Sequence, residues 1–204
     1  IDFHRDREIA AKSGADIVFN PDAQEMYPDG YLTYIEVEEV SKVLEGKFRP
    51  THFRGVATVV AKLFHATRPH VAVFGQKDAQ QAYIVRQMVQ DLNFNVEVIV
   101  APIVREPDGL AMSSRNVYLK GDERSHAGAL YKSLRHVEGL VKSGERSVKT
   151  LRAEMEQILK QAQPTHIDYI AFVRPASFSE VETIDPPGVL IALAVRFGST
   201  RLID

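Results

Sequence analysis

The chain has 204 residues, enough for one ordinary domain or for a domain with a small appendage. Hydrophobic residues make up 45% and charged residues 25%, and the formal net charge of −2 argues against a general nucleic-acid or membrane surface. The absence of cysteine excludes a thiol nucleophile, a disulfide framework and a cysteine-ligated metal site. No apolar stretch is long enough to span a bilayer, so we expect a cytoplasmic protein without nucleic-acid or membrane partners.

The first half of the chain alternates strand and helix signals. A polar, amphipathic stretch over residues 1–14 indicates a helix, and the apolar patterns that follow it predict further strands and helices. The predicted strands are 15–21, 31–37, 70–75 and 96–102, and the predicted helices are 38–47, 51–67 and 79–92. Thr51 is the expected N-cap of its helix. The last strand–helix–strand series predicts a βαβ unit with a parallel sheet.

The pattern changes after Pro102. A loop-like stretch comes first, then two long helical patterns separated by Ser143 and Gly144, then three strands. The loop is 105–119, the helices are 122–142 and 147–161, and the strands are 166–173, 188–198 and 201–204. Helices followed by strands, without strict alternation, predict a small α+β unit that begins near residues 104–106.

The octapeptide "FGQKDAQQ", residues 74–81, lies where a predicted parallel strand ends, and ligands of open parallel sheets bind beyond such ends. Gly75 would allow a sharp backbone turn, and Asp78 would cap the next helix, with Gln81 completing a capping-box-like pair. Lys77 beside a helix N-terminus would suit a phosphate. A capping Asp78 with a merely solvated Lys77 is an equally good interpretation of these eight residues.

A second polar cluster is "AMSSRN", residues 111–116. Two hydroxyls and the guanidinium of Arg115 could wrap a polyphosphate, although a polar loop leading into a helix has the same composition. A third cluster, "RPTHFRGV", places Arg49, His52 and Arg54 around a helix start, where cations oppose the helix dipole. A bound anion or a nearby carboxylate would compensate them.

Several known motifs do not occur in the sequence. It has no G-x-G-x-x-G, Walker A, G-x-S-x-G or H-E-x-x-H pattern, and its seven histidines show no ligand-pair spacing. No acidic cluster indicates a metal cage. Any divalent metal is therefore expected to arrive with nucleotide phosphates.

In their order along the chain, "RPTHFRGV", "RPHVAVFGQKDAQQAYIVRQMV" and "VREPDGLAMSSRNVYL" resemble the pantothenate synthetase (pantoate–β-alanine ligase) family. The likeness covers nearly the whole chain, with Gln76 where the family usually has glutamate. It implies an α/β fold: a Rossmann-like parallel-sheet nucleotidyltransferase domain over 1–104, lacking its N-terminal part, then a smaller α+β lid domain over 105–204. The family's His-x-Gly-His segment does not occur in this sequence, so we expect a piece of a longer protein that is inactive alone.

The resemblance also implies the chemistry. The family condenses pantoate with β-alanine through a pantoyl adenylate made from ATP, releasing pyrophosphate and then AMP. It implies a homodimer, and Mg²⁺ carried by the nucleotide phosphates rather than by metal ligands of the protein. Two other functions remain open: a nucleotide-binding module without catalysis, and a cytidylyltransferase of the same superfamily, which "RPTHFRGV" and "GLAMSSRN" disfavour.

Site residues follow from the same resemblance. It implies that Gly75 and Asp78 contact the ribose, that the Val104 backbone reads the adenine edge, and that Met112 opens an ATP-binding loop. The implied ATP-binding residues are Gly75, Gln76, Lys77, Asp78, Val104, Met112, Ser113, Ser114 and Arg115. Gln81 and Arg49 would bind pantoate. The implied catalytic residues are Lys77, Ser113, Ser114 and Arg115.

Overall fold

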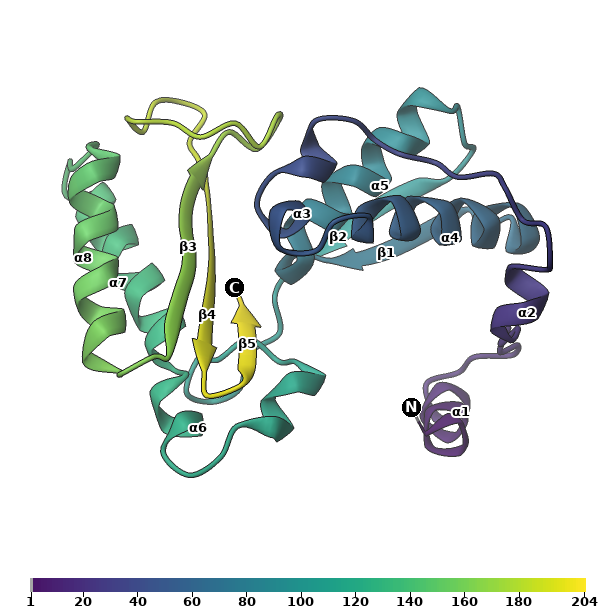
Figure 1. Ribbon diagram of the computed structural model, residues 1–204, viewed down its shortest axis with the longest axis horizontal. Helices are drawn as coiled ribbons and strands as arrows, with labels where there is room; N and C mark the ends of the chain where they lie inside the picture. Colours follow the sequence, from purple (N-terminus) through teal and green to yellow (C-terminus); the bar gives the residue numbers. More distant parts are fainter. Residues whose placement is uncertain (1) are drawn as a thin grey trace. The chain divides into compact units, whose positions relative to one another are not determined.

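The computed structural model describes residues 2–204, which separate into two compact units, Ile1–Tyr34 and Ile35–Asp204 (Figure 1). The first unit contains α1 (Phe3–Lys12) and α2 (Ala23–Met26). Asp2 caps α1 by accepting a hydrogen bond from the Arg5 amide. The predicted N-terminal helix is therefore confirmed. The domain boundary that we predict between residues 104 and 105 differs from the division after Tyr34 and stays a prediction.

The strand predicted over residues 15–21 is wrong. This stretch has no regular structure, and the side chain of Ile17 is 85% exposed. Within residues 2–204 no strand pairs with it, and an unpaired strand leaves its backbone groups without partners. The strand predicted over 31–37 is also wrong, because the Ile35 amide donates instead to the Thr58 hydroxyl, at 3.0 Å.

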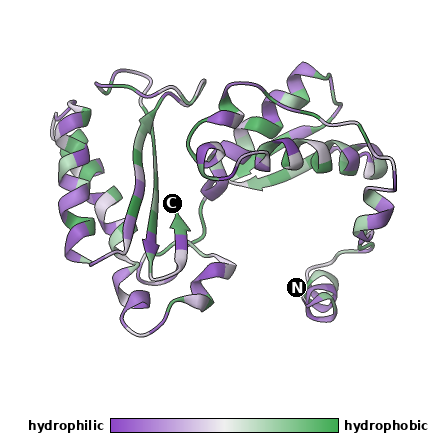
Figure 2. Cartoon of the chain, viewed as in Figure 1, coloured by the Kyte–Doolittle hydropathy of each residue, from purple (hydrophilic) through white to green (hydrophobic). Residues whose placement is uncertain are grey.

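The βαβ unit is confirmed. Strand β1 (Val71–Gly75) pairs in parallel with β2 (Glu97–Ala101), from Val71 opposite Glu97 to Gly75 opposite Ala101. Helices α4 (His52–Thr67) and α5 (Ala79–Asp91) contribute most of the buried side chains of this part. The largest of them are Phe53, Phe64, Ile84, Val85 and Met88. Figure 2 shows the strands as mainly hydrophobic, which suits a sheet under helices.

The segment before α4 differs from its prediction. The helix predicted over 38–47 is two short pieces, η1 (Val40–Lys42) and α3 (Glu45–Phe48). They are separated at Leu44, whose φ of 45° is incompatible with a continuing right-handed helix. Thr51 is the N-cap residue of α4, as predicted, but its φ is 66° and its side chain makes no capping hydrogen bond in the described chain.

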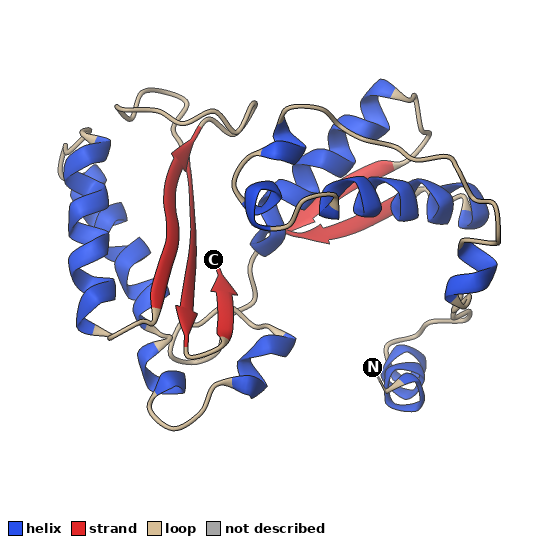
Figure 3. Cartoon of the chain, in the orientation of Figure 1, coloured by secondary structure: helices blue, strands red, loops and turns tan. Residues whose placement is uncertain are grey.

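The remainder of the second unit begins with η2 (Gln76–Asp78), which joins β1 to α5, and η3 (Ser114–Tyr118). The helix predicted over 122–142 forms as α6 (Glu123–His126) and α7 (Ala129–Lys142), and α8 (Val148–Gln161) matches its prediction. The three predicted strands follow, and they pair as an antiparallel sheet in the order β3–β4–β5 (Figure 3). Their bounds are His166–Val173, Leu190–Phe197 and Thr200–Ile203.

The β3 strand contributes to two hydrophobic cores. Ile170 and Phe172 pack in the core of α7 and α8, whereas Ala171 and Val173 belong to the core of α4 and α5. Successive side chains of a strand point to opposite faces, so this alternation places the antiparallel sheet between both cores. No helix within residues 2–204 has the length and apolarity that crossing a bilayer requires.

Candidate active site

A cavity of about 630 Å³ in the second unit collects most of the predicted site residues. Its walls come from α3, the β1–α5 turn, the stretch around 103–116, and strands β4 and β5. The predicted residues that line it are Arg49, Gln76, Lys77, Asp78, Gln81, Ser113, Ser114 and Arg115. Gly75, Val104 and Met112 are not among the described residues that line it.

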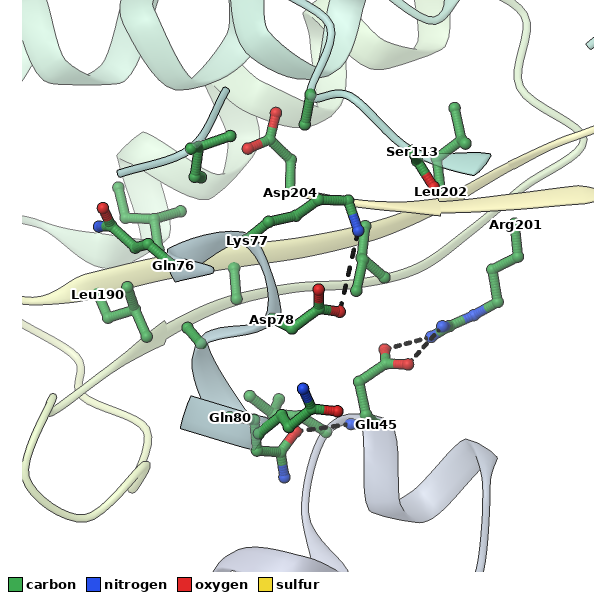
Figure 4. A pocket seen from close by; sticks show the side chains of 18 of the residues that line it. Glu45, Gln76, Lys77, Asp78, Gln80, Ser113, Leu190, Arg201, Leu202 and Asp204 are labelled. Atoms are coloured by element: carbon green, nitrogen blue, oxygen red, sulfur yellow. Dashed lines mark hydrogen bonds and ion pairs between the residues drawn. The ribbon is translucent and has the colours of Figure 1, made fainter. Parts of the chain in front are cut away.

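The turn between β1 and α5 presents Lys77 and Asp78 to the cavity (Figure 4). The Lys77 ammonium lies 3.9 Å from the Asp78 carboxylate, too far for a hydrogen bond, and the Asp78 side chain is 49% exposed. Within the described chain this carboxylate does not cap α5, so the predicted capping-box-like pair with Gln81 is wrong. Lys77 and Asp78 are therefore two separate polar groups beside the start of a helix.

Gly75 needs no unusual backbone conformation. Its φ is −78°, so the turn that leads from β1 into η2 does not depend on the conformational freedom of glycine. A Cβ added at position 75 would meet no described atom within 4 Å. The space beside Gly75 is thus open, which leaves room for a ligand to approach the backbone.

The stretch containing residues 111–116 folds back on the chain. The Met112 amide donates to the Val104 carbonyl at 2.9 Å, and both side chains are exposed. The Ser113 hydroxyl accepts from the Arg115 amide at 3.2 Å, which caps η3. The Arg115 guanidinium donates to the carbonyl of Arg201 on β5, at 3.3 Å. A single long hydrogen bond to a neutral acceptor holds Arg115 only weakly, so a bound anion could replace it.

Arg49 and His52 lie together at the start of α4. Arg49 Nη1 is 3.2 Å from His52 Nε2. A guanidinium only donates, so His52 Nε2 accepts and the ring proton of the neutral form is on Nδ1. Burial lowers the pKa of His52, and the positive charge of Arg49 lowers it further. His52 is thus a neutral neighbour of Arg49 rather than a second cation.

Three cations of the cavity wall have no carboxylate within hydrogen-bonding distance in the described chain. Within residues 2–204, neither Arg49 nor Arg115 has a carboxylate within 4.0 Å, and Lys77 has only the distant Asp78. Three cations from separate segments therefore face one space, and two serine hydroxyls accompany them. Such a set is suited to a polyphosphate or another polyanion.

Two acidic side chains of the same cavity, Glu45 and Asp204, are already paired with arginines. Glu45 accepts two hydrogen bonds from Arg201, and Asp204 accepts two from Arg105, at 2.6 and 2.8 Å. The described residues contain no group of three His, Asp or Glu side chains placed to hold a metal ion. The donor set thus fits a phosphate better than it fits a metal ion held by the protein.

The sequence interpretation missed these paired residues: Glu45, Arg105, Arg201 and Asp204. A charged residue inside an otherwise apolar strand could have indicated Arg201, because ionised side chains are almost never buried without a partner. Arg201 lies in "RLID" and Asp168 in "HIDYIAFV", and the two side chains form an ion pair in the structure. Sequence alone does not show which such residues meet.

Known proteins resemble the chain over its full length. The sequence model of the family described as pantoate-beta-alanine ligase matches residues 1–204. A pantothenate synthetase of Acetivibrio thermocellus is 53% identical over 203 residues, which cover 100% of this chain and 72% of that protein. The crystal structure of pantothenate synthetase from Thermus thermophilus is similar with a TM-score of 0.95 and 42% identity, covering 100% of this chain and 74% of that one.

One further solved structure is of interest because of its ligands. It is a pantoate-beta-alanine ligase from Francisella tularensis, complexed with beta-gamma ATP and beta-alanine. Its sequence is 32% identical to this chain, the TM-score is 0.75, and the match covers 100% of this chain and 69% of that one.

Proposed function

The chain belongs to the pantoate–β-alanine ligase family, a family of ATP-using ligases of pantothenate biosynthesis, and we propose that it works through a pantoyl adenylate. In the first step a carboxylate oxygen of pantoate attacks the α-phosphorus of ATP, and the bond from that phosphorus to pyrophosphate breaks. In the second step the amine of β-alanine attacks the acyl carbon, and AMP leaves with the electron pair of the broken C–O bond.

One observation carries this proposal: Arg49, Lys77 and Arg115 come from three segments and line one cavity. Adenylyl transfer needs positioned substrates and neutralised charge more than a protein nucleophile. Lys77 and Arg115 would neutralise the charge that develops on the α-phosphate and the leaving pyrophosphate. The hydroxyls of Ser113 and Ser114 would donate to the same oxygens, and all four would be catalytic.

The other predicted residues have binding roles in this proposal. Gln81 and Arg49 hold pantoate, and Gly75, Gln76 and Asp78 contact the nucleotide beside the β1–α5 turn. The Val104 backbone would read the adenine edge and Met112 would open the ATP-binding loop, and both are next in sequence to residues that line the cavity. Because Glu45 and Asp204 are paired with arginines, Mg²⁺ would arrive on the ATP phosphates and keep its waters. The homodimer and the cytoplasmic location stay predictions.

We also propose that the 204-residue chain has no catalytic activity by itself. The His-x-Gly-His segment, to which the family resemblance assigns ATP contacts, does not occur in this sequence. The chain covers 72% of the Acetivibrio relative. Pantoate-dependent exchange of pyrophosphate into ATP by the purified chain would contradict this proposal.

The test of the adenylate mechanism is the substitution Lys77→Ala in the complete gene product, with pantoate-dependent ATP–pyrophosphate exchange as the assay. We expect the rate to fall by more than ~10-fold, equivalent to about 1.4 kcal/mol of transition-state stabilisation. Lys149→Ala is the matched control, because Lys149 is exposed on α8 and does not line the cavity. A smaller loss in Lys77→Ala, or an equal loss in the control, contradicts the role of Lys77.

The same assay separates the alternatives. ATP binding without any exchange would favour a nucleotide-binding module. Reaction of CTP with a phosphorylated alcohol, without reaction of pantoate, would favour a cytidylyltransferase.

A further inference from the structure

Arg201, on β5, is a largely buried cation with two carboxylate partners. Its side chain is only 10% exposed. Its guanidinium donates two hydrogen bonds of 2.7 Å to the carboxylate of Glu45 (Figure 4). Its Nε donates to Asp168. Tyr169 donates a further hydrogen bond to Glu45, at 2.8 Å. Arg201 thus joins β5 to the short helix α3 through a bidentate ion pair, which fixes both position and orientation.

Aromatic rings complete this contact. The guanidinium carbon of Arg201 lies 5.0 Å from the centre of the Phe48 ring, at the end of α3, and 6.0 Å from that of Tyr169. The opposite ends of α3, Glu45 and Phe48, therefore both contact one side chain of β5. A planar cation between a carboxylate and a ring restrains a short helix along its length.

Helix α3 requires such restraint because its flanks are strained. Glu39, Leu44 and Thr51 have φ values of 60°, 45° and 66°, a region that non-glycine residues rarely occupy. Strained backbone persists only where surrounding contacts impose it. A four-residue helix cannot impose it by itself, since isolated short helices are unstable.

A second clamp acts from the side of α5. Gln80 is buried, and its amide nitrogen donates to the carbonyls of Val40 and Val43, at 2.7 and 2.8 Å. Its amide oxygen accepts from the backbone N–H of Glu45, at 3.2 Å. Gln80 therefore holds the backbone before α3, whereas Arg201 holds the side chain with which α3 begins.

The segment held by these two clamps leads directly to Arg49. This residue follows Phe48, and its amide donates to the Glu45 carbonyl at 2.9 Å. Arg49 lines the cavity beside His52. A shift of α3 would therefore displace Arg49, whereas Arg115 on the other wall is bonded to the Arg201 carbonyl, which every substitution of the Arg201 side chain retains.

We propose that Arg201 is a positioning residue, which acts through Glu45 to hold α3 in the conformation that presents Arg49 to the cavity. This inference rests on the proposed function, in which Arg49 binds pantoate. It assigns the C-terminal strand a share in recognising the acid, although that strand belongs to a different sheet from β1 and β2.

The principal variant is Glu45→Gln in the complete gene product. Glutamine keeps the size of the side chain, leaves Arg201 its Asp168 partner, and retains the backbone bond to Gln80. We expect the KM for pantoate to rise by ~5-fold or more while the KM for ATP changes by less than ~2-fold. Arg201→Lys keeps the positive charge but cannot form the bidentate pair, so it should have the same effect.

Two further variants sharpen the test. In the double variant Glu45→Gln/Arg201→Lys, the KM for pantoate should be within ~2-fold of the higher of the two single-variant values. The two effects should not add, because both substitutions break one shared contact. Arg196→Gln is the matched control: it removes the other arginine of Asp168, at 3.1 Å, without reaching Glu45. An unchanged KM for pantoate in Glu45→Gln, an equal rise in both KM values, or the same effect in Arg196→Gln would overturn the proposal.

A readout without substrates keeps this inference separate from the proposed function. Hydrogen exchange of the backbone amides of residues 45–49 should be faster in Glu45→Gln and Arg201→Lys than in the wild type, and unchanged in Arg196→Gln. If the complete gene product shows no pantoate-dependent ATP–pyrophosphate exchange, the proposed function fails. The amide hydrogen exchange rates still decide whether Arg201 holds α3. Unaltered hydrogen exchange of residues 45–49 in both Glu45→Gln and Arg201→Lys would overturn the positioning role.

Discussion

His52 shows how a single contact sets the charge of a residue in the cavity. Burial and the neighbouring Arg49 both disfavour its protonated form and lower its pKa. We therefore expect the NMR titration of the His52 ring to have its midpoint below the ordinary value of about 6.5. Arg49→Gln should raise that midpoint, because the closest positive charge is removed while burial remains.

The His52 resonances can be assigned by their loss in His52→Gln. Arg68→Gln is the control for the Arg49 substitution, because Arg68 lies at the opposite end of α4. A midpoint of 6.5 or higher in the wild type, or equal shifts in both arginine variants, would show that Arg49 does not determine the charge of His52.

At the scale of elements, the contact between η1 and α3 depends on the absence of a side chain at Gly46. A Cβ at this position would lie 1.9 Å from the carbonyl oxygen of Ser41, and a backbone atom cannot move aside easily. We expect Gly46→Ala to lower the free energy of unfolding by roughly 1–3 kcal/mol, the usual effect of overpacking. Urea unfolding of the 204-residue chain measures this change.

Gly139→Ala is the matched control for that substitution. Gly139 lies inside α7, where an added Cβ would meet no described atom within 4 Å. Alanine is favoured over glycine in a helix, so this variant should be unchanged or more stable by up to ~1 kcal/mol. Similar losses in both variants would contradict the steric explanation.

The elements that sequence predicted correctly share a clear hydrophobic period and a partner within the chain. Helix α4 and the β1–β2 pair are of this kind, because each buries its apolar side chains on neighbouring elements. Residues 15–21 have the composition of a strand but no partner strand in the described chain. Local composition predicts the tendency of a segment to form a strand, whereas a partner strand decides whether the strand forms.

Thr51 and Asp78 occupy the predicted N-cap positions without making capping hydrogen bonds, and this has a different physical cause. Thr51 and Asp78 are good capping residue types, yet the backbone at Thr51 is left-handed and Asp78 turns toward Lys77. Glu45, which follows Leu44, is bonded to Gln80 and Arg201, and both of these residues are distant in sequence. No local pattern contains that information. Eight predicted site residues nevertheless line one cavity: five lie beside the correctly predicted β1, α4 and α5, and three lie in the stretch predicted as a loop.

At the scale of the whole molecule, the buried charges that join α3 to the antiparallel sheet should make stability sensitive to acid. Burial alone would raise the pKa of Glu45 and of Asp168, but hydrogen bonds from Arg201, aided by Tyr169 and Arg196, lower both pKa values. The unfolded chain then binds more protons than the folded one as the pH falls. The stabilisation is present above the ordinary carboxyl pKa values of about 4 and is lost as the pH falls through the lower folded values.

Glu45→Gln tests this linkage. At neutral pH the variant should be less stable than the wild type by roughly 1–3 kcal/mol, the range for lost hydrogen bonds to charged groups. The difference should narrow between pH 5 and pH 3, values chosen to span the ordinary carboxyl pKa of about 4, because the wild type loses the same interaction by protonation. Urea unfolding at a series of pH values measures both curves, with Glu36→Gln as an exposed control. Curves that stay parallel down to about pH 3 would show that the Glu45–Arg201 pair does not contribute to acid sensitivity, since protonation of a linked group must change the slope.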